Sequence, residues 1–187
     1  MLKRTMGGFA VLLIMSCWIY SQPAAKTDWK TFEDKKLGIS FNYPGAGTTS
    51  VEKSFFDAGS FTVSVKTERT ATTDLWWNYH LEKKLGPCSD NFSKPEPSDI
   101  PADIPKTKAI GKAVLALSVD TANISGFGDE YTSLGVDYHG AIFRNCWVAG
   151  YEENTVTKAP KPEAKVLAAM RAEFLKWVDS IAIRPVK

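Results

Sequence analysis

The 187-residue sequence lacks the motifs on which most catalytic and metal sites depend. It has only two histidines and three cysteines, and no Cys-x-x-Cys pair that could begin a zinc site. No Gly-x-Ser-x-Gly nucleophile turn occurs, and the Gly126 to Gly128 turn is not followed by the Lys-Ser/Thr of a phosphate-binding loop. The sequence therefore predicts no catalytic residue, no metal ligand and no cofactor, in a protein that is not an enzyme.

The chain also lacks the basic excess of a nucleic-acid-binding protein. Its formal net charge is +2, and Lys3 and Arg4 at the N-terminus account for that excess. Binding to nucleic acid requires a basic surface that displaces counterions from the phosphates. We therefore expect no nucleic-acid partner, and the partner is left as an unknown protein or a small apolar ligand.

The N-terminus has the features of a secretory signal. Lys3 and Arg4 precede an apolar run over residues 6–20, and Ser21-Gln22-Pro23 ends it. The run is shorter than the roughly 18 to 20 apolar residues that span a bilayer. We therefore predict a signal peptide over residues 1–25 and a single domain over residues 26–187. The protein would be exported, to the periplasm or the outer membrane, or alternatively secreted.

Cys17 lies within this leader. The run Ile14-Met15-Ser16-Cys17 resembles a bacterial lipoprotein processing box, in which the cysteine becomes the lipidated first residue. Ordinary cleavage further along the chain and a retained leader remain alternatives. Contact with a membrane is expected only through the signal or a lipid anchor.

The other two cysteines, Cys88 and Cys146, are expected to form a disulfide, because exported chains meet oxidising conditions. Closing so long a loop would stabilise the fold by about 4 kcal/mol in the chain-entropy model. Two separate buried thiols are the alternative.

Alternating apolar and polar residues predict strands over residues 37–43, 61–65 and 134–138. A hairpin turn expected at residues 57–60 pairs the strand at 61–65 with a further strand over residues 51–56. Residues 113–119 are apolar on both faces, which predicts a central strand. A further strand is expected over residues 142–151. The sheet should be mostly antiparallel, and with its helices it makes an α+β fold.

Two helices are predicted. The later one begins at Pro162 and places Val166, Met170, Phe174 and Trp177 on one apolar stripe. A closing edge strand is expected near residues 181–184. The earlier one covers residues 74–85 and has apolar residues on two opposite sides.

The proline-rich segment 86–106 follows the earlier helix. Either this loop covers the helix's second apolar side, or that side stays bare for a partner. The candidate partner surface consists of Trp76, Tyr79, Pro95 and Pro97.

The run Phe32 to Pro44, which contains LGISFNYP, resembles the opening strand pair of Mog1/PsbP-like domains. The Tyr138-His139-Gly140 turn and the helix-to-strand run from Phe174 to Ile183 are similar to exported bacterial members. The resemblance implies an α/β/α sandwich, in which helices flank both faces of an antiparallel sheet, and a non-enzymatic accessory or binding role. It implies no functional residue.

Two functions therefore compete. The favoured one is a non-enzymatic exported accessory or binding protein of the cell envelope, with lipidation at Cys17 as an option. The alternative is an exported hydrolase whose site is assembled from scattered residues such as His80, Ser89 and Asp90.

Overall fold

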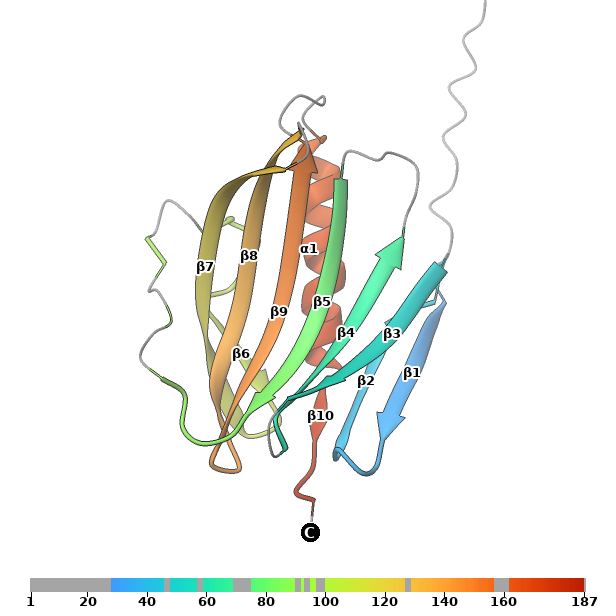
Figure 1. Ribbon diagram of the computed structural model, residues 1–187, viewed down its shortest axis with the longest axis vertical. Coiled ribbons are helices and arrows are strands. Elements are labelled where there is room, and N and C mark those ends of the chain that lie inside the picture. Colours follow the sequence, from blue (N-terminus) through green and yellow to red (C-terminus); the bar gives the residue numbers. More distant parts are fainter. Residues whose placement is uncertain are drawn as a thin grey trace, which may run out of the picture.

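The computed structural model describes residues 28–45, 48–56, 59–68, 75–89, 92, 95–96, 100–126, 129–156 and 162–186. These residues form two antiparallel sheets and one helix (Figure 1). The elements, in chain order, are β1 (Trp29–Asp34), β2 (Ile39–Pro44), β3 (Thr48–Phe55), β4 (Phe61–Glu68), β5 (Leu75–Lys84), β6 (Thr107–Ile110), β7 (Ala113–Gly126), β8 (Asp129–Ile142), β9 (Asn145–Val156), α1 (Ala164–Asp179) and β10 (Ala182–Ile183). The predicted α+β fold with a mostly antiparallel sheet is confirmed.

The larger sheet has seven strands in the order β3-β4-β5-β9-β8-β7-β6, and the smaller has three in the order β1-β2-β10. Helix α1 runs alongside the strands of the larger sheet and contacts β2 of the smaller one (Figure 1). Phe41 of β2 meets Trp177 of α1 edge to face, with ring centroids 5.7 Å apart. The helix therefore joins the two sheets through one hydrophobic core.

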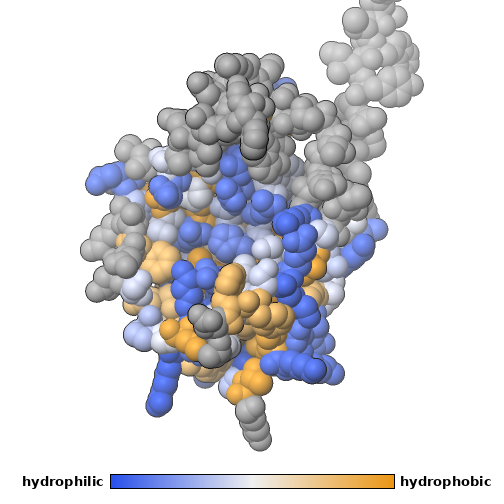
Figure 2. All heavy atoms as spheres, viewed as in Figure 1, coloured by the Kyte–Doolittle hydropathy of each residue, from blue (hydrophilic) through white to orange (hydrophobic). Residues whose placement is uncertain are grey.

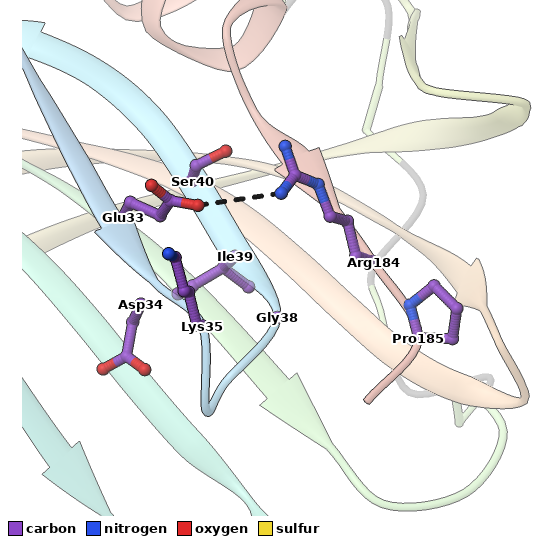
Figure 3. Close-up of a pocket in the computed structure, with 8 residues that line it drawn as sticks. All are labelled: Glu33, Asp34, Lys35, Gly38, Ile39, Ser40, Arg184 and Pro185. Carbon is purple, nitrogen blue, oxygen red and sulfur yellow. Dashed lines mark ion pairs between the residues drawn. The ribbon is translucent and has the colours of Figure 1, made fainter. Parts of the chain in front are cut away.

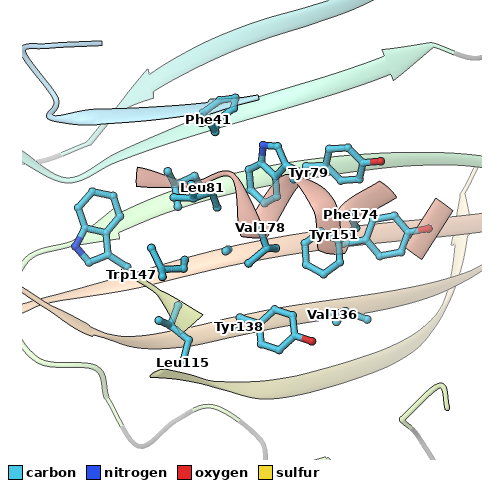
Figure 4. Close-up of a cluster of buried hydrophobic side chains, with 14 of the residues drawn as sticks. Phe41, Tyr79, Leu81, Leu115, Val136, Tyr138, Trp147, Tyr151, Phe174 and Val178 are labelled. Carbon is cyan, nitrogen blue, oxygen red and sulfur yellow. The ribbon is translucent and has the colours of Figure 1, made fainter. Parts of the chain in front are cut away.

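Aromatic rings dominate this core (Figure 4). The ring of Phe174 lies 5.2 to 6.0 Å from four other rings, those of Tyr79, Tyr138, Tyr151 and Trp177. All five side chains are buried. Each pair of packed aromatic rings adds about 0.5 to 1.5 kcal/mol beyond the burial of area. The contacts of Phe174 make it the centre of the core.

The later helix is confirmed, because α1 buries Met170, Phe174 and Trp177 as the apolar spacing predicts. The exception is Val166, which is 39% exposed one turn into the helix. After the helix, β10 pairs with β2 at the edge of the smaller sheet, so the closing edge strand is also confirmed.

The earlier helix is wrong, because residues 75–84 form strand β5. Trp77, Tyr79 and Leu81 alternate into the core, whereas Asn78 and His80 between them are half-buried. Trp77 and Leu81 from one side of the predicted helix therefore share a single strand face with Tyr79 from the other side, because successive side chains of a strand point in opposite directions. The described residues therefore contain one helix, on one face of the sheet.

Two strand assignments also need correction. Residues 113–119 belong to β7, which lies beside the edge strand β6 and is not central. The His139-Gly140 pair is not a turn, because β8 continues to Ile142. The chain turns instead at Phe143 and Arg144, whose φ angles are 49° and 66°.

The predicted disulfide joins Cys88, just after β5, to Cys146 on β9, with the sulfur atoms 2.03 Å apart. Beyond it, Phe92 stacks on His139 of β8 with ring centroids 3.8 Å apart. Further along, Ile104 is buried, and the Pro105 carbonyl accepts a hydrogen bond of 2.7 Å from the Tyr138 hydroxyl. The described parts of the proline-rich segment are thus fastened to β8 and β9 at both ends.

Candidate functional site

We call the face of the seven-stranded sheet that points away from α1 the outer face. No helix among the described residues covers it. Its side chains alternate with those of the core, so that His80 lies between Tyr79 and Leu81 on β5, and Asp137 lies between Val136 and Tyr138 on β8. The polar positions of these strands therefore meet on one surface.

His80 and Asp137 form a pair across this surface, although they lie on strands that are not neighbours. Each is directly opposite Gly150 of the intervening strand β9. The Nε2 atom of His80 lies 3.5 Å from Oδ1 of Asp137. Gly150 leaves the space for this pair, because a Cβ there would come within 2.1 Å of the imidazole and 2.3 Å of the carboxylate. A glycine inside a strand often marks such a close approach.

A shallow groove of about 290 Å³ surrounds the pair. Its lining residues are His80, Asp120, Ser133, Gly135, Asp137, Tyr151 and Glu152. Three of them are carboxylates and none is a lysine or an arginine, so the groove suits a group with positive charge or hydrogen-bond donors. Within the described part of the chain, no cluster of three or more His, Cys, Asp or Glu residues could hold a metal ion.

Burial perturbs the titration of two groups on the outer face, Asp137 in the groove and His139 beside it in the sequence of β8. It raises the pKa of the Asp137 carboxyl, and the neighbouring His80 opposes this effect only in part. Burial also lowers the pKa of His139, which is stacked on Phe92. A carboxyl group that is placed where burial disfavours its charged form is more typical of a functional site than of an ordinary surface.

The raised pKa of Asp137 gives a testable pH dependence. The folded chain binds the Asp137 proton more tightly than the unfolded chain. The contribution of Asp137 to the free energy of unfolding is therefore fully present below pH 3.8, and it is lost as the pH rises through the raised pKa. We therefore expect Asp137→Asn to gain stability relative to the wild type between pH 4 and pH 8. Urea unfolding across this range measures the difference. If the variant instead loses stability relative to the wild type as the pH rises, attraction to His80 outweighs burial.

A second buried polar cluster lies beneath α1. The Arg171 guanidinium donates to the Glu153 carboxylate at 3.3 Å and lies 3.5 Å from Asp103. Burial raises the pKa of Glu153, although Arg171 opposes this rise. The cluster is closed by its own partners and ties α1 to β9 and to the segment before β6, so we assign it a structural role.

A small hollow of about 150 Å³ lies where the smaller sheet meets the C-terminal segment (Figure 3). Arg184 reaches across it to Glu33, with Nη1 and Oε1 3.6 Å apart. The backbone of Arg184 also donates to the Gly38 carbonyl at 2.7 Å. The side chain and backbone of Arg184 thus fasten the segment after β10 to β1 and to the β1–β2 turn, and we assign the hollow no binding role.

The structure separates the residues of the predicted partner surface. Tyr79 is wrong as a surface residue, because it is fully buried and its hydroxyl donates to Glu173 at 2.8 Å. Pro95 is half-buried. The Trp76 side chain, Pro97 and Cys17 lie outside the described residues, as does the predicted signal peptide over residues 1–25.

Of the residues in the hydrolase alternative, His80 lies in the groove. Ser89 is exposed beside Cys88 and does not line the groove, and Asp90 lies outside the described residues. The sequence does not single out Asp137, the partner that His80 has in the structure. Asp137 is a polar position within the alternating run 134–138. This alternation indicates on which face of the strand Asp137 lies, but not which residue of another strand lies beside it.

Comparisons with known proteins add little. No family model matches the chain, and no curated protein matches it. Among solved structures, it is similar to a crystal structure from Bacteroides thetaiotaomicron VPI-5482, with 14% identity and a TM-score of 0.40 over 83% of this chain and 48% of that one. The chain thus spans about half the length of that protein. The resemblance to Mog1/PsbP-like domains stays a prediction.

Proposed function

We propose that this chain is an exported, non-enzymatic binding protein that captures a cationic or donor-rich group in the groove of its outer face. The observation that supports this most directly is the His80–Asp137 pair, held 3.5 Å apart over Gly150. It places a carboxylate with a burial-raised pKa beside a histidine, in a groove that contains two further carboxylates. A ligand cation would relieve the unfavourable burial of that charge.

Export is part of the proposal and has two supports. The disulfide between Cys88 and Cys146 is a bond that persists in oxidising compartments. The charged and apolar N-terminus has the pattern of a secretory signal. In the described part of the chain no helix combines the length and the hydrophobicity needed to cross a bilayer. An accessory role in the cell envelope, as the Mog1/PsbP-like resemblance implies, fits this set of features.

Binding is tested with small probes that differ only in charge. We expect benzylamine and benzylguanidine, but not benzyl alcohol, to shift the backbone amide resonances of β5, β8 and β9 around the groove in heteronuclear NMR spectra. Loss of a hydrogen bond to a charged group removes about 1.5 to 3 kcal/mol, so Asp137→Asn should weaken amine binding by at least about tenfold. Equal binding of the alcohol, or shifts on another surface, would count against the proposal.

Two further variants make this test specific. Gly150→Ala keeps both polar side chains but forces His80 and Asp137 apart, so it should also weaken amine binding. Glu163→Gln removes the same charge just before α1 without lining the groove, and we expect it to bind amines like the wild type. If the two carboxylate variants behave alike, the effect is one of net charge and not of the groove.

The hydrolase alternative has one observation in its favour. Ser64 of β4 lies directly opposite His80 in the sheet, so that Ser64, His80 and Asp137 follow one another in a row. Against it, catalysis of acyl transfer needs free backbone or side-chain donors for the oxyanion, and in the middle of a sheet the backbone donors are used by neighbouring strands. Turnover of any ester or amide in a substrate panel, abolished by His80→Ala, would favour the hydrolase.

A further inference from the structure

One end of the molecule brings together the turns of the β1–β2, β6–β7 and β8–β9 hairpins and the adjoining ends of β3, β4 and β5. We call it the hairpin pole and define it as residues 33–38, 53–56, 82–85, 111–114, 141–145 and 184–186. The strand register places these segments together, because Phe55 lies opposite Phe61, Phe61 opposite Lys83, and Lys83 opposite Trp147 near the β8–β9 turn. The hairpin pole is the lower end of Figure 1.

The hairpin pole is unusually apolar for an exposed surface. Of the seven large hydrophobic side chains that are exposed in the described part of the chain, all but Val166 lie there. They are Phe55 (63% exposed), Phe56 (58%), Leu85 (50%), Val114 (70%), Phe143 (55%) and Val186 (55%). Figure 2 shows hydrophobic side chains gathered toward this end, with hydrophilic ones projecting beside them. A soluble monomer rarely gathers exposed aromatic residues in this way without using them.

The same pole carries an excess of positive charge, although the chain as a whole is nearly neutral. It contains eight cationic side chains, Lys35, Lys36, Lys53, Lys83, Lys84, Lys112, Arg144 and Arg184, and three anionic ones, Glu33, Asp34 and Glu82. Each anion forms an ion pair with one of the cations, Arg184, Lys53 or Lys84. Five cations therefore remain without an ion pair to any residue that the structure describes.

The β8–β9 turn holds its exposed side chains at the expense of backbone strain. Phe143 and Arg144 form a two-residue turn in which both φ angles are positive, at 49° and 66°. Asparagine and glycine are the residues that favour such a turn, whereas a bulky aromatic residue there is an outlier. Strain of this kind tends to persist where the side chain has a function. Here the strain presents a phenylalanine and an arginine at the tip of the hairpin pole.

We infer that the hairpin pole docks on the surface of an anionic lipid bilayer. Exposed phenylalanines at the turn tips can enter the boundary between headgroups and acyl chains, while the surrounding lysines and arginines face the anionic headgroups. An apolar groove of about 620 Å³, lined by Ile110, Ala113, Ile142, Phe143 and Ile183 among others, opens between these turns and β10. The docking surface is separate from the outer-face groove, so either inference can fail alone.

Residues 6–20 are apolar and would bind vesicles by themselves, so binding of the full chain alone does not test the inference. The measurement must map which residues contact the lipid. Hydrogen exchange is measured by mass spectrometry at short labelling times in two samples. One contains vesicles of neutral phosphatidylcholine, and the other contains vesicles of phosphatidylcholine with about 30% anionic phosphatidylglycerol. We expect slower exchange in residues 54–56 and 59–61 and in the turns at residues 111–113 and 142–145, with the anionic vesicles only. Bound protein without protection at these turns would overturn the inference.

Two sets of variants separate charge from apolar contact. Lys36, Lys112 and Arg144 each contribute about 1 kcal/mol near an anionic surface, so replacing all three by glutamine should weaken binding to anionic vesicles about 100-fold. The matched control replaces Lys30, Lys66 and Lys165 by glutamine. Lys30 near the start of β1 and Lys66 near the end of β4 lie at the strand ends that point away from the hairpin pole, and Lys165 lies in the first turn of α1. Salt screens exposed charges beyond a Debye length of about 10 Å, so replacing these lysines should change binding little. Equal losses in the two triple variants would contradict docking through this pole.

A double variant at the strained turn guards against loss of folding as the explanation. Phe143→Asn with Arg144→Gly supplies the residues that this turn type prefers, so the melting temperature should rise. Its affinity for anionic vesicles should nevertheless fall at least about tenfold, because one inserting ring and one charge are removed. Unchanged vesicle binding would overturn the inference. So would a wild-type dimer that this variant dissociates, since a second copy would then occupy the pole.

Discussion

Phe174→Ala is expected to lower the free energy of unfolding by about 3 to 5 kcal/mol, which is the usual loss for a large aromatic side chain removed from a core. Phe174 is fully buried and its ring contacts four other aromatic rings. These rings come from β5, β8, β9 and α1, so the void would lie where three strands meet the helix. Rigid aromatic neighbours leave little room for collapse, which places the loss toward the upper end of the range. Urea unfolding followed by tryptophan fluorescence measures it.

Val166→Ala provides the control on the same helix. Val166 lies on the apolar stripe that the sequence predicts, but it is 39% exposed. Its truncation should change the free energy of unfolding by less than about 0.5 kcal/mol, as is usual at the surface. A comparable loss in both variants would show that the stability of α1 depends on its own propensity and not on the ring cluster around Phe174.

Replacing both Cys88 and Cys146 by serine is expected to lower the free energy of unfolding by about 2 to 4 kcal/mol. The disulfide joins residues that are 58 positions apart in the sequence, so the unfolded chain gains conformational freedom when the bond is absent. The serine at position 146 would place a hydroxyl where the cysteine is only 1% exposed, and this adds to the loss. Chemical unfolding of the variant and of the wild type, with and without a reducing agent, measures the effect.

The reducing agent supplies the control for this second prediction. It should destabilise the wild type by a similar amount and leave the double serine variant unchanged. If the reduced wild type kept its full stability, the contacts of the proline-rich segment, such as the Phe92–His139 stack, would hold the segment without the bond. The disulfide would then matter for protection from proteolysis more than for the equilibrium.

Of the two residues in the candidate site, the sequence indicates His80 but not Asp137. The sequence indicates His80 as a candidate, but on a predicted helix and grouped with Ser89 and Asp90, because a single sequence shows only which residues are close along the chain. In the structure its partner is Asp137, 57 positions away and two strands across the sheet. The link between them is Gly150, a residue that attracts no notice in the sequence because its role is to have no side chain.

The error at residues 75–84 had a similar origin. Trp76, Trp77 and Tyr79 give apolar residues at spacings that fit the two sides of a helix as well as a strand with one buried face. What decides between them is the pair of flanking strands, because β4 and β9 offer hydrogen-bond partners on both edges of β5. A short apolar run cannot reveal such partners. The strand then places Tyr79 in the core and His80 on the outer face.

The sequence by itself determined the α+β class, helix α1 with its buried stripe, the β3–β4 hairpin and the pairing of Cys88 with Cys146. Each of these follows from local periodicity, from turn residues or from the small number of cysteines. Only the tertiary structure decided that β5 is a strand, that His80 meets Asp137, and that exposed phenylalanines and an excess of lysine and arginine share the hairpin pole. These features depend on which strands lie side by side and in which register, and that choice is made by burial across the whole sheet and not by any one segment.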